Sequence, residues 1–169
     1  MRIINKEETI HWLSERGLTN STGMFSFSGF VEVMDSPIPV DSGRKTAISR
    51  AIVLSFDTDN EALLWINEFG IWESSEDRNL FEGFRRSLGE HRPLHEKPGH
   101  IFSSSDLINV RSLVAMTLYF VWGGILYSPA KRLAIKISHD EHISFFARDK
   151  KDVSNITEDF KKYLDSGDK

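Results

Sequence analysis

The chain has 169 residues and a formal net charge of −4 at pH 7, and 40% of its residues are hydrophobic and 27% are charged. This length predicts one globular domain, because a domain of about 150 residues buries about 70% of the surface that its unfolded chain exposes. The sequence contains no cysteine, which excludes disulfide bonds, thiolate nucleophiles and cysteine-based zinc or iron–sulfur sites. We expect a single domain over residues 1–169, with a polar tail at about 165–169.

The distribution of charge argues against a nucleic-acid partner. A surface that follows phosphates carries a basic stripe on one face, whereas the basic pairs of this chain are isolated and have acidic neighbours. We interpret these pairs as solvated positions and expect no nucleic-acid partner. The pairs are Arg85/Arg86, Lys131/Arg132, Lys150/Lys151 and Lys161/Lys162.

The hydropathy of the chain predicts a soluble, cytoplasmic protein without a membrane partner. Residues 1–17 carry charges throughout and lack the apolar core of a signal peptide. The apolar run that follows Ser112 extends for about 15 residues, whereas a membrane-spanning helix needs about 20. We interpret this run as a buried helix that leads into a buried strand.

In chain order, a predicted helix is followed by two predicted strands. Residues 6–16 have the apolar spacing of a short helix. The alternation of aromatic and small residues over 24–33 predicts a strand with a bend at Gly29, and prolines and aspartates predict a loop over 34–44. The β-branched run at 46–56 predicts a long strand.

The middle of the chain is predicted to be helical. Residues 57–72 suit a short helix that one of its first aspartates caps. Residues 74–88 have the clearest helical signature, with Ser74 or Ser75 as N-cap, acidic residues in the first turn, arginines in the last turn and Gly89 just beyond it.

The last third is predicted to contain the core helix, three strands and a closing helix. Residues 103–120 form the most apolar helix of the chain. Three short runs at 123–128, 132–138 and 142–148 are separated by turn residues and predict an antiparallel meander. Apolar residues at helical spacing over 152–166 predict the closing helix.

The order of these elements favours an α+β fold over a doubly wound sheet, because strands and helices occur in blocks and do not alternate. We expect one domain with an antiparallel or mixed β-sheet. Its C-terminal three-strand meander should pack against a buried apolar helix, and two to four further helices should complete the fold.

The histidines gather in two short clusters with acidic residues beside them. "HEKPGH" has one residue more than the zinc-protease pattern His-Glu-x-x-His, and its proline forbids a continuous helix. The pattern His-x-Glu at 139–141 lacks the two cysteines of a deaminase zinc site. We therefore predict no catalytic residue, no metal ligand and no cofactor. The clustered histidines are His91, His95, His100, His139 and His142.

Two interpretations of these histidines stay open. One is structural: His100 is a partly buried histidine that bonds to the backbone, and His139 with Asp140 forms a turn. The other is a metal-dependent hydrolase, which requires two separate loops to meet with supporting hydrogen bonds, and is therefore disfavoured. Its converging ligands would be His95, His100, His139 and Glu141.

The tryptophans are a second source of candidates. Trp65 and Trp72 flank the segment "INEFGI", and Trp122 follows the predicted core helix. Large rings are usually buried in a core, but an exposed tryptophan would be an anchor for a protein partner. In that case the acidic balance of the chain would favour a basic partner through electrostatic steering.

Four segments resemble a bacterial family of similar length. They are "LLWINEFGIWESSED", "LHEKPGHIF", "YFVWGG" and "ISHDE". Together they resemble an uncharacterised family over residues 62–141. The resemblance implies a bacterial, cytoplasmic protein, and it brings no activity, cofactor or site residue to this chain.

The sequence as a whole favours a small cytoplasmic bacterial interaction protein without catalytic activity, for example an immunity protein that neutralises a toxin. Its expected partner is a protein. One alternative is a metal-dependent hydrolase that uses the two histidine-rich loops, and another is a structural subunit with an extended apolar patch. The candidate binding residues are Trp65, Trp72, His95, His100, Trp122, His139 and Glu141.

Overall fold

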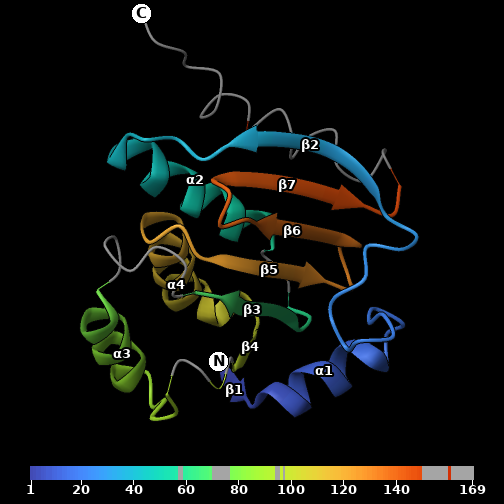
Figure 1. Ribbon diagram of the computed structural model, residues 1–169, viewed down its shortest axis with the longest axis horizontal. Helices are drawn as coiled ribbons and strands as arrows, with labels where there is room; N and C mark the ends of the chain where they lie inside the picture. Colours follow the sequence, from blue (N-terminus) through green and yellow to red (C-terminus); the bar gives the residue numbers. More distant parts are fainter. Residues whose placement is uncertain (57–58, 70–76, 94–95, 97, 150–159, 161–169) are drawn as a thin grey trace, which may run out of the picture.

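One sheet organises the molecule, and the computed structural model describes residues 1–56, 59–69, 77–93, 96, 98–149 and 160. In this part of the chain, seven strands form one antiparallel sheet in the order β1-β4-β3-β5-β6-β7-β2, with four α-helices around it (Figure 1). The predicted α+β fold is confirmed, and the three C-terminal strands are adjacent as the meander requires. The strands are β1 Arg2–Ile4, β2 Val31–Pro37, β3 Ala62–Glu68, β4 Gly99–Phe102, β5 Gly123–Ser128, β6 Leu133–Ile137 and β7 His142–Ala147. The helices are α1 Lys6–Ser14, α2 Ser42–Ser55, α3 Arg78–Ser87 and α4 Leu107–Tyr119, with a short 3-10 helix at Ser104–Asp106.

The helices cover the two faces of the sheet unequally. Helices α2 and α4 pack against each other behind the strands in Figure 1, and their buried residues form the larger core together with Phe81 of α3 and apolar residues of the sheet. Helix α1 contributes Trp12 and Leu13 to a second, smaller core, which also includes residues of the loop that follows α1. We name these two cores the helix-side core and the α1-side core.

Strand β3 lies between β4 and β5 and is buried on both faces. Leu64 and Ile66 belong to the helix-side core, whereas Leu63 and Trp65 belong to the α1-side core. A strand buried on both faces needs a continuous apolar run, and such a run cannot be told from a buried helix by its periodicity. The helix predicted over 57–72 is therefore wrong for the residues that form β3.

The long strand predicted over 46–56 is also wrong, because these residues belong to helix α2. The side chain of Asp41 accepts a hydrogen bond from the N–H of Arg44 at 2.8 Å and so begins the helix. Ile48 and Ile52 are one helical turn apart, and both are fully buried. The burial of this helical face overrides the preference of β-branched residues for strands.

The strand predicted over 24–33 begins later and ends later than expected. Strand β2 pairs with β7 as far as Pro37, through part of the loop predicted over 34–44. The aromatic residues before β2 pack in a loop, where the ring centroids of Phe25 and Phe27 are 4.8 Å apart. Their alternation reflects packing onto the α1-side core, and not the pairing of a strand.

The other predicted helices agree with the structure in position. Asp77 is the N-cap of helix α3, because its side chain accepts a hydrogen bond from the N–H of Leu80 at 2.9 Å, so the predicted serine N-cap is wrong. The closing helix predicted over 152–166 and the polar tail lie outside the described residues, apart from Phe160. The ring of Phe160 lies 4.5 Å from that of Phe145.

The apolar run after Ser112 divides between two elements, as predicted. It forms most of α4, which ends at Tyr119, and continues into β5 from Gly123. Within the described ranges, no helix has both the length and the apolar character that crossing a membrane requires.

Gly123 allows β5 to approach β3 closely. A Cβ atom at this position would lie 2.2 Å from Glu68 Oε2 and 2.7 Å from Glu68 Cβ. We predict that Gly123→Ala lowers the free energy of unfolding by about 1–3 kcal/mol, because the added methyl group must push the two strands apart. Urea unfolding of the variant and the wild type measures this difference.

Gly83→Ala is the matched control, because a Cβ atom at Gly83 on α3 meets no atom within 4 Å. Alanine favours the helical conformation over glycine, so this variant should be more stable than the wild type by about 0.5–1 kcal/mol. Equal free energies of unfolding for Gly123→Ala and the wild type would contradict the close contact of the two strands.

Candidate functional site

Two of the predicted tryptophans lie in the cores of the protein. Trp65 is 3% exposed and Trp122 is 1% exposed. The ring of Trp122 packs edge-on against Phe81, with 4.5 Å between the centroids. Neither tryptophan therefore presents a face that a partner protein could contact. Trp72 and His95 lie outside the described residues.

His139 and Glu141 lie in the turn between β6 and β7, and both make contacts within the chain. His139 Nδ1 is 2.9 Å from Glu68 Oε2, and its Nε2 is 3.5 Å from Asp140 Oδ1. Glu141 has a φ of 65°, and its carbonyl accepts a hydrogen bond from the N–H of Ile38 at 2.6 Å. The predicted turn is confirmed, and carboxylates on both sides of the imidazole fix its orientation.

His100 lies on β4 and is buried in the interior. Its Nδ1 is 3.3 Å from the carbonyl oxygen of Leu64 on β3. The interpretation of a histidine that bonds to the backbone is confirmed, with the side chain fully buried and not partly buried. In the part of the chain that the structure describes, no three His, Asp or Glu side chains are placed to hold a metal ion. No observation on these residues favours the hydrolase hypothesis.

A serine, a histidine and an aspartate meet on β2 and β7, but not in the order of a catalytic triad. Asp35 accepts a hydrogen bond from Ser144 Oγ at 2.6 Å and lies 2.8 Å from His142 Nδ1. The hydrogen bond from Ser144 is the main cause that lowers the pKa of Asp35. A nucleophilic serine must donate to the imidazole, so we interpret this cluster as a contact between neighbouring strands.

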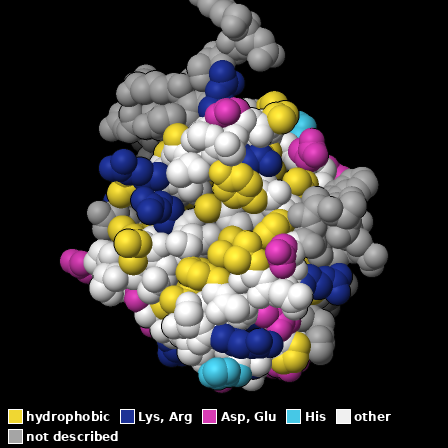
Figure 2. All heavy atoms as spheres, turned by 90° about the vertical axis from the view of Figure 1, so that its left-hand side faces the viewer, with side chains coloured by type: hydrophobic (Ala, Val, Ile, Leu, Met, Phe, Trp, Pro, Cys, Tyr) yellow, Lys and Arg dark blue, Asp and Glu magenta, His cyan; other side chains and the backbone are white. Residues whose placement is uncertain are grey.

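Exposed hydrophobic side chains occur on several elements. Figure 2 shows such side chains near the middle of one face, with charged side chains around them. A patch of this kind does not by itself identify a partner, so the structural subunit stays a prediction. The large hydrophobic residues exposed among the described ones are Met24, Val31, Val40, Leu54, Leu80, Ile108 and Tyr119.

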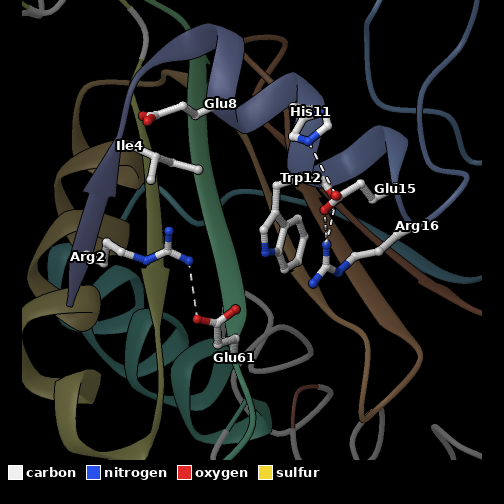
Figure 3. Close-up of a pocket in the computed structure, with 8 residues that line it drawn as sticks. All are labelled: Arg2, Ile4, Glu8, His11, Trp12, Glu15, Arg16 and Glu61. Carbon is white, nitrogen blue, oxygen red and sulfur yellow. Dashed lines mark hydrogen bonds and ion pairs between the residues drawn. The ribbon is translucent and has the colours of Figure 1, made fainter.

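A groove opens between α1, β1 and the residue before β3 (Figure 3). Its volume is about 350 Å³, at the lower end of the roughly 300–1,000 Å³ of small-molecule sites. Ile4 and Trp12, both nearly buried, form the apolar part of its lining. The other lining side chains are all ionisable: Arg2, Glu8, His11, Glu15, Arg16 and Glu61.

Ion pairs and one ring contact hold the polar side chains of the groove. Arg2 Nη2 is 3.3 Å from Glu61 Oε1, and Arg16 Nη1 is 3.7 Å from Glu15 Oε2. The guanidinium group of Arg16 stacks on Trp12, 3.7 Å from the ring centroid. Exposed ion pairs are worth at most about 1 kcal/mol each, so Arg2 and Glu61 can change partners when a ligand enters. Arg16 is held more firmly, because its Nη1 also donates a hydrogen bond to the carbonyl oxygen of Trp12 at 2.8 Å.

The indole N–H of Trp12 is buried and has no hydrogen-bond acceptor among the described residues. Figure 3 shows the indole nitrogen on the edge of the ring that is turned toward Arg2 and Glu61, inside the groove. A buried donor without an acceptor costs about 1–3 kcal/mol. No local pattern in the sequence identifies Trp12 as a site residue, because the groove forms only when the sheet brings Arg2 and Glu61 together.

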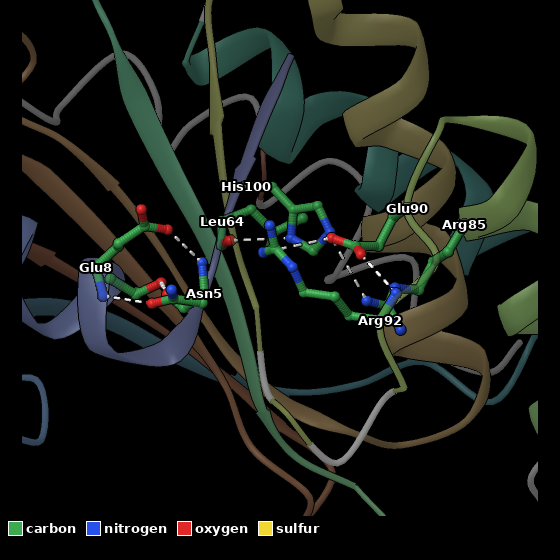
Figure 4. Close-up of polar contacts among 8 residues, drawn as sticks. Asn5, Glu8, Leu64, Arg85, Glu90, Arg92 and His100 are labelled. Atoms are coloured by element: carbon green, nitrogen blue, oxygen red, sulfur yellow. Dashed lines mark hydrogen bonds and ion pairs between the residues drawn. The ribbon is translucent and has the colours of Figure 1, made fainter.

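A second group of polar side chains is buried between α3 and β4 (Figure 4). Arg85, Glu90 and His100 are at most 5% exposed, whereas the side chain of Arg92 is 38% exposed. Glu90 Oε2 lies 4.0 Å from Arg85 Nη2 and 3.7 Å from Arg92 Nη1. We name these four residues the basic cluster.

The interpretation of Arg85 and Arg86 as a solvated pair is wrong for Arg85, which is 1% exposed. Arg86 is exposed and forms an ion pair with Glu82 at 3.0 Å. Arg85 follows the buried Phe81 by four residues, so it lies on the same face of α3. The four-residue spacing from Phe81 is the feature of the sequence that indicates the burial of Arg85. Consecutive residues lie on different faces of a helix, so Arg86 cannot share this face.

Burial changes the ionisation of the basic cluster. It lowers the pKa of His100 to about 4, with a smaller contribution from the charge of Arg85. Burial also lowers the pKa of Arg85, while the carboxylate of Glu90 opposes this shift. At neutral pH His100 is therefore uncharged, and two guanidinium groups face one carboxylate within the cluster.

Comparisons with known proteins add no family to these observations. No protein-family model, no curated protein and no solved structure matches this chain.

The lowered pKa of His100 predicts a loss of stability in acid. In the unfolded chain a histidine binds a proton at about pH 6.5, whereas in the folded protein His100 does so only at about pH 4. The stability that depends on uncharged His100 is complete above about pH 6.5 and is lost progressively as the pH falls toward 4. The loss should be about 3 kcal/mol, because one pKa unit corresponds to about 1.4 kcal/mol.

His100→Asn removes this titration and should make the free energy of unfolding less dependent on pH. Urea unfolding of the variant and the wild type at about pH 7 and pH 5 measures the difference. His11→Asn is the control, because the side chain of His11 is 75% exposed. If His100→Asn kept the pH dependence of the wild type, the burial of an uncharged imidazole would be wrong.

Proposed function

We propose that this protein acts in a bacterial cytoplasm as a non-catalytic protein-binding module, in the manner of an immunity protein. The groove beside α1 would receive a basic segment of the partner. The observation that carries the proposal is the buried indole N–H of Trp12, which faces the groove and has no acceptor among the described residues. A main-chain carbonyl of a bound peptide is an acceptor that would complete it. Because the N–H is buried in the unbound protein, side chains that line the groove must move to admit this carbonyl.

The charge of the groove favours a basic segment. Glu8, Glu15 and Glu61 supply three carboxylates, against the guanidinium groups of Arg2 and Arg16. The net charge of −4 also steers cationic partners toward the protein. A lysine or arginine of the partner can replace Arg2 beside Glu61 at little cost, because both of these side chains are exposed.

The groove also has the composition of an interface centre. Tryptophan and arginine are enriched among the residues that dominate binding energies, and here Arg16 stacks on Trp12. Ile4 adds an apolar surface beside them. The stem of a partner lysine or arginine would pack on the small part of Ile4 and Trp12 that the groove leaves exposed, while its cationic head reaches the carboxylates.

A selection of randomised displayed peptides on the folded protein tests this function. We expect the enriched peptides to contain lysine or arginine, and fluorescence polarisation then gives their dissociation constants. Trp12→Phe keeps an aromatic ring and removes the N–H, so it should weaken binding about five- to tenfold, the value of one hydrogen bond. Glu61→Gln should weaken binding and reduce its dependence on salt.

Glu7→Gln is the matched control, because Glu7 lies on the same helix but does not line the groove. This variant should bind the enriched peptides as the wild type does. The proposal fails if the enriched peptides show no preference for basic residues. It also fails if Trp12→Phe and Glu61→Gln bind them as tightly as the wild type.

A further inference from the structure

The basic cluster holds hydrogen-bond donors in the interior without acceptors. Arg85 Nε, Nη1 and Nη2 and Arg92 Nη1 are buried and have no hydrogen-bond partner among the residues that the structure describes. Burying a guanidinium group is costly unless its charge is paired and its N–H groups are bonded. Buried polar groups with a purely structural role usually have such partners.

Glu90 does not supply the acceptors. Its Oε2 lies 4.0 Å from Arg85 Nη2 and 3.7 Å from Arg92 Nη1, and both distances are longer than a hydrogen bond. Its Oε1 already accepts a hydrogen bond from the main-chain N–H of Arg92 at 2.7 Å. Two guanidinium groups therefore face one carboxylate within the cluster, and the carboxylates of Glu82 and Glu96 act on Arg85 only as more distant charges without bonding to it.

His100 adds an acceptor to these donors. A carbonyl oxygen can only accept, so the contact between Nδ1 and the carbonyl of Leu64 places the proton on Nδ1. Nε2 of the uncharged ring is then an acceptor, and it too is buried without a partner in the described part of the chain. A ligand that completes the cluster must offer negative oxygens to the arginines and a donor to His100.

We propose that the basic cluster binds a small oxyanion that retains a hydroxyl group, such as hydrogen phosphate or bicarbonate. The oxygens of the anion accept hydrogen bonds from Arg85 and Arg92, and its hydroxyl donates to Nε2 of His100. The planar fork of a guanidinium group suits two oxygens of such an anion. The side chain of Arg92 is 38% exposed and so connects the buried part of the cluster with the solvent.

Thermal unfolding in phosphate, bicarbonate, sulfate and acetate at equal ionic strength and near-neutral pH tests the proposal. Sulfate shares the tetrahedral shape of phosphate, and acetate shares the planar carboxylate of bicarbonate, but neither carries a hydroxyl group at this pH. At about 100 times its dissociation constant, the ligand should raise the unfolding midpoint by roughly 5–10 °C. We expect this shift from phosphate or bicarbonate, and the comparison between these two identifies the ligand.

Arg85→Met tests the site, because it removes the charge and nearly keeps the volume of the side chain. The variant should lose the shift, while its midpoint in the absence of the ligand stays equal to that of the wild type or rises. Arg86→Met changes the exposed neighbour of Arg85 and should keep the shift. Arg92→Gln, at the exposed end of the cluster, should weaken binding at least about tenfold in a heat titration.

Three results would overturn the proposal. The first is an unfolding midpoint that neither phosphate nor bicarbonate raises. The second is an equal shift from sulfate or acetate, since that would reflect general salt stabilisation or an anion site that does not use His100. The third is retention of the shift in Arg85→Met together with unchanged binding by Arg92→Gln.

Discussion

Strand β3 must bury both of its faces, and the arrangement of the molecule follows from this constraint. Its side chains enter the two cores alternately, with Leu64 and Ile66 on the helix side and Leu63 and Trp65 on the α1 side. A sheet that is apolar on both faces needs a layer on each. Helices α2 and α4 supply one layer, and α1 with the aromatic loop after it supplies the other (Figure 1).

The two layers also separate the two polar features of the molecule. Trp12 and the groove lie on the α1 side, whereas His100 pairs with Leu64 and shares the helix side with it. The interior disfavours both a buried guanidinium group and an unbonded indole N–H. The two proposals give both features the same explanation: a ligand would complete each of them, a basic peptide in the groove and a small oxyanion in the basic cluster.

The parts of the fold that the sequence predicts are those that depend on neighbouring residues. Helical spacing and turn residues lie within a few positions of each other, so the positions of α3, α4 and the three C-terminal strands are predicted correctly, although the N-cap of α3 is not. Residues 46–56 are predicted as a strand but belong to helix α2, and residues 62–68 are predicted as a helix but form strand β3. In both segments the burial of apolar side chains in the fold outweighs the local sequence pattern. The candidate sites depend on residues that lie far apart in the chain, which no local pattern encodes. Examples are Arg2, which pairs with Glu61, and Arg85, whose charge acts on His100. For the basic cluster, the sequence indicates only that His100 is buried and that Arg85 lies on the buried face of its helix.

One NMR measurement decides most directly whether Arg85 is buried without an acceptor from the protein. The Nε–H signal of Arg85 is assigned by its absence from the spectrum of Arg85→Met. It reports how fast this N–H exchanges with water and whether the N–H is hydrogen-bonded. We expect this signal to be protected from exchange and to move when hydrogen phosphate or bicarbonate is added, while the indole signal of Trp12 stays in place. An Nε–H of Arg85 that exchanges as fast as that of the exposed Arg86, or that neither anion moves, would contradict both the burial and the site.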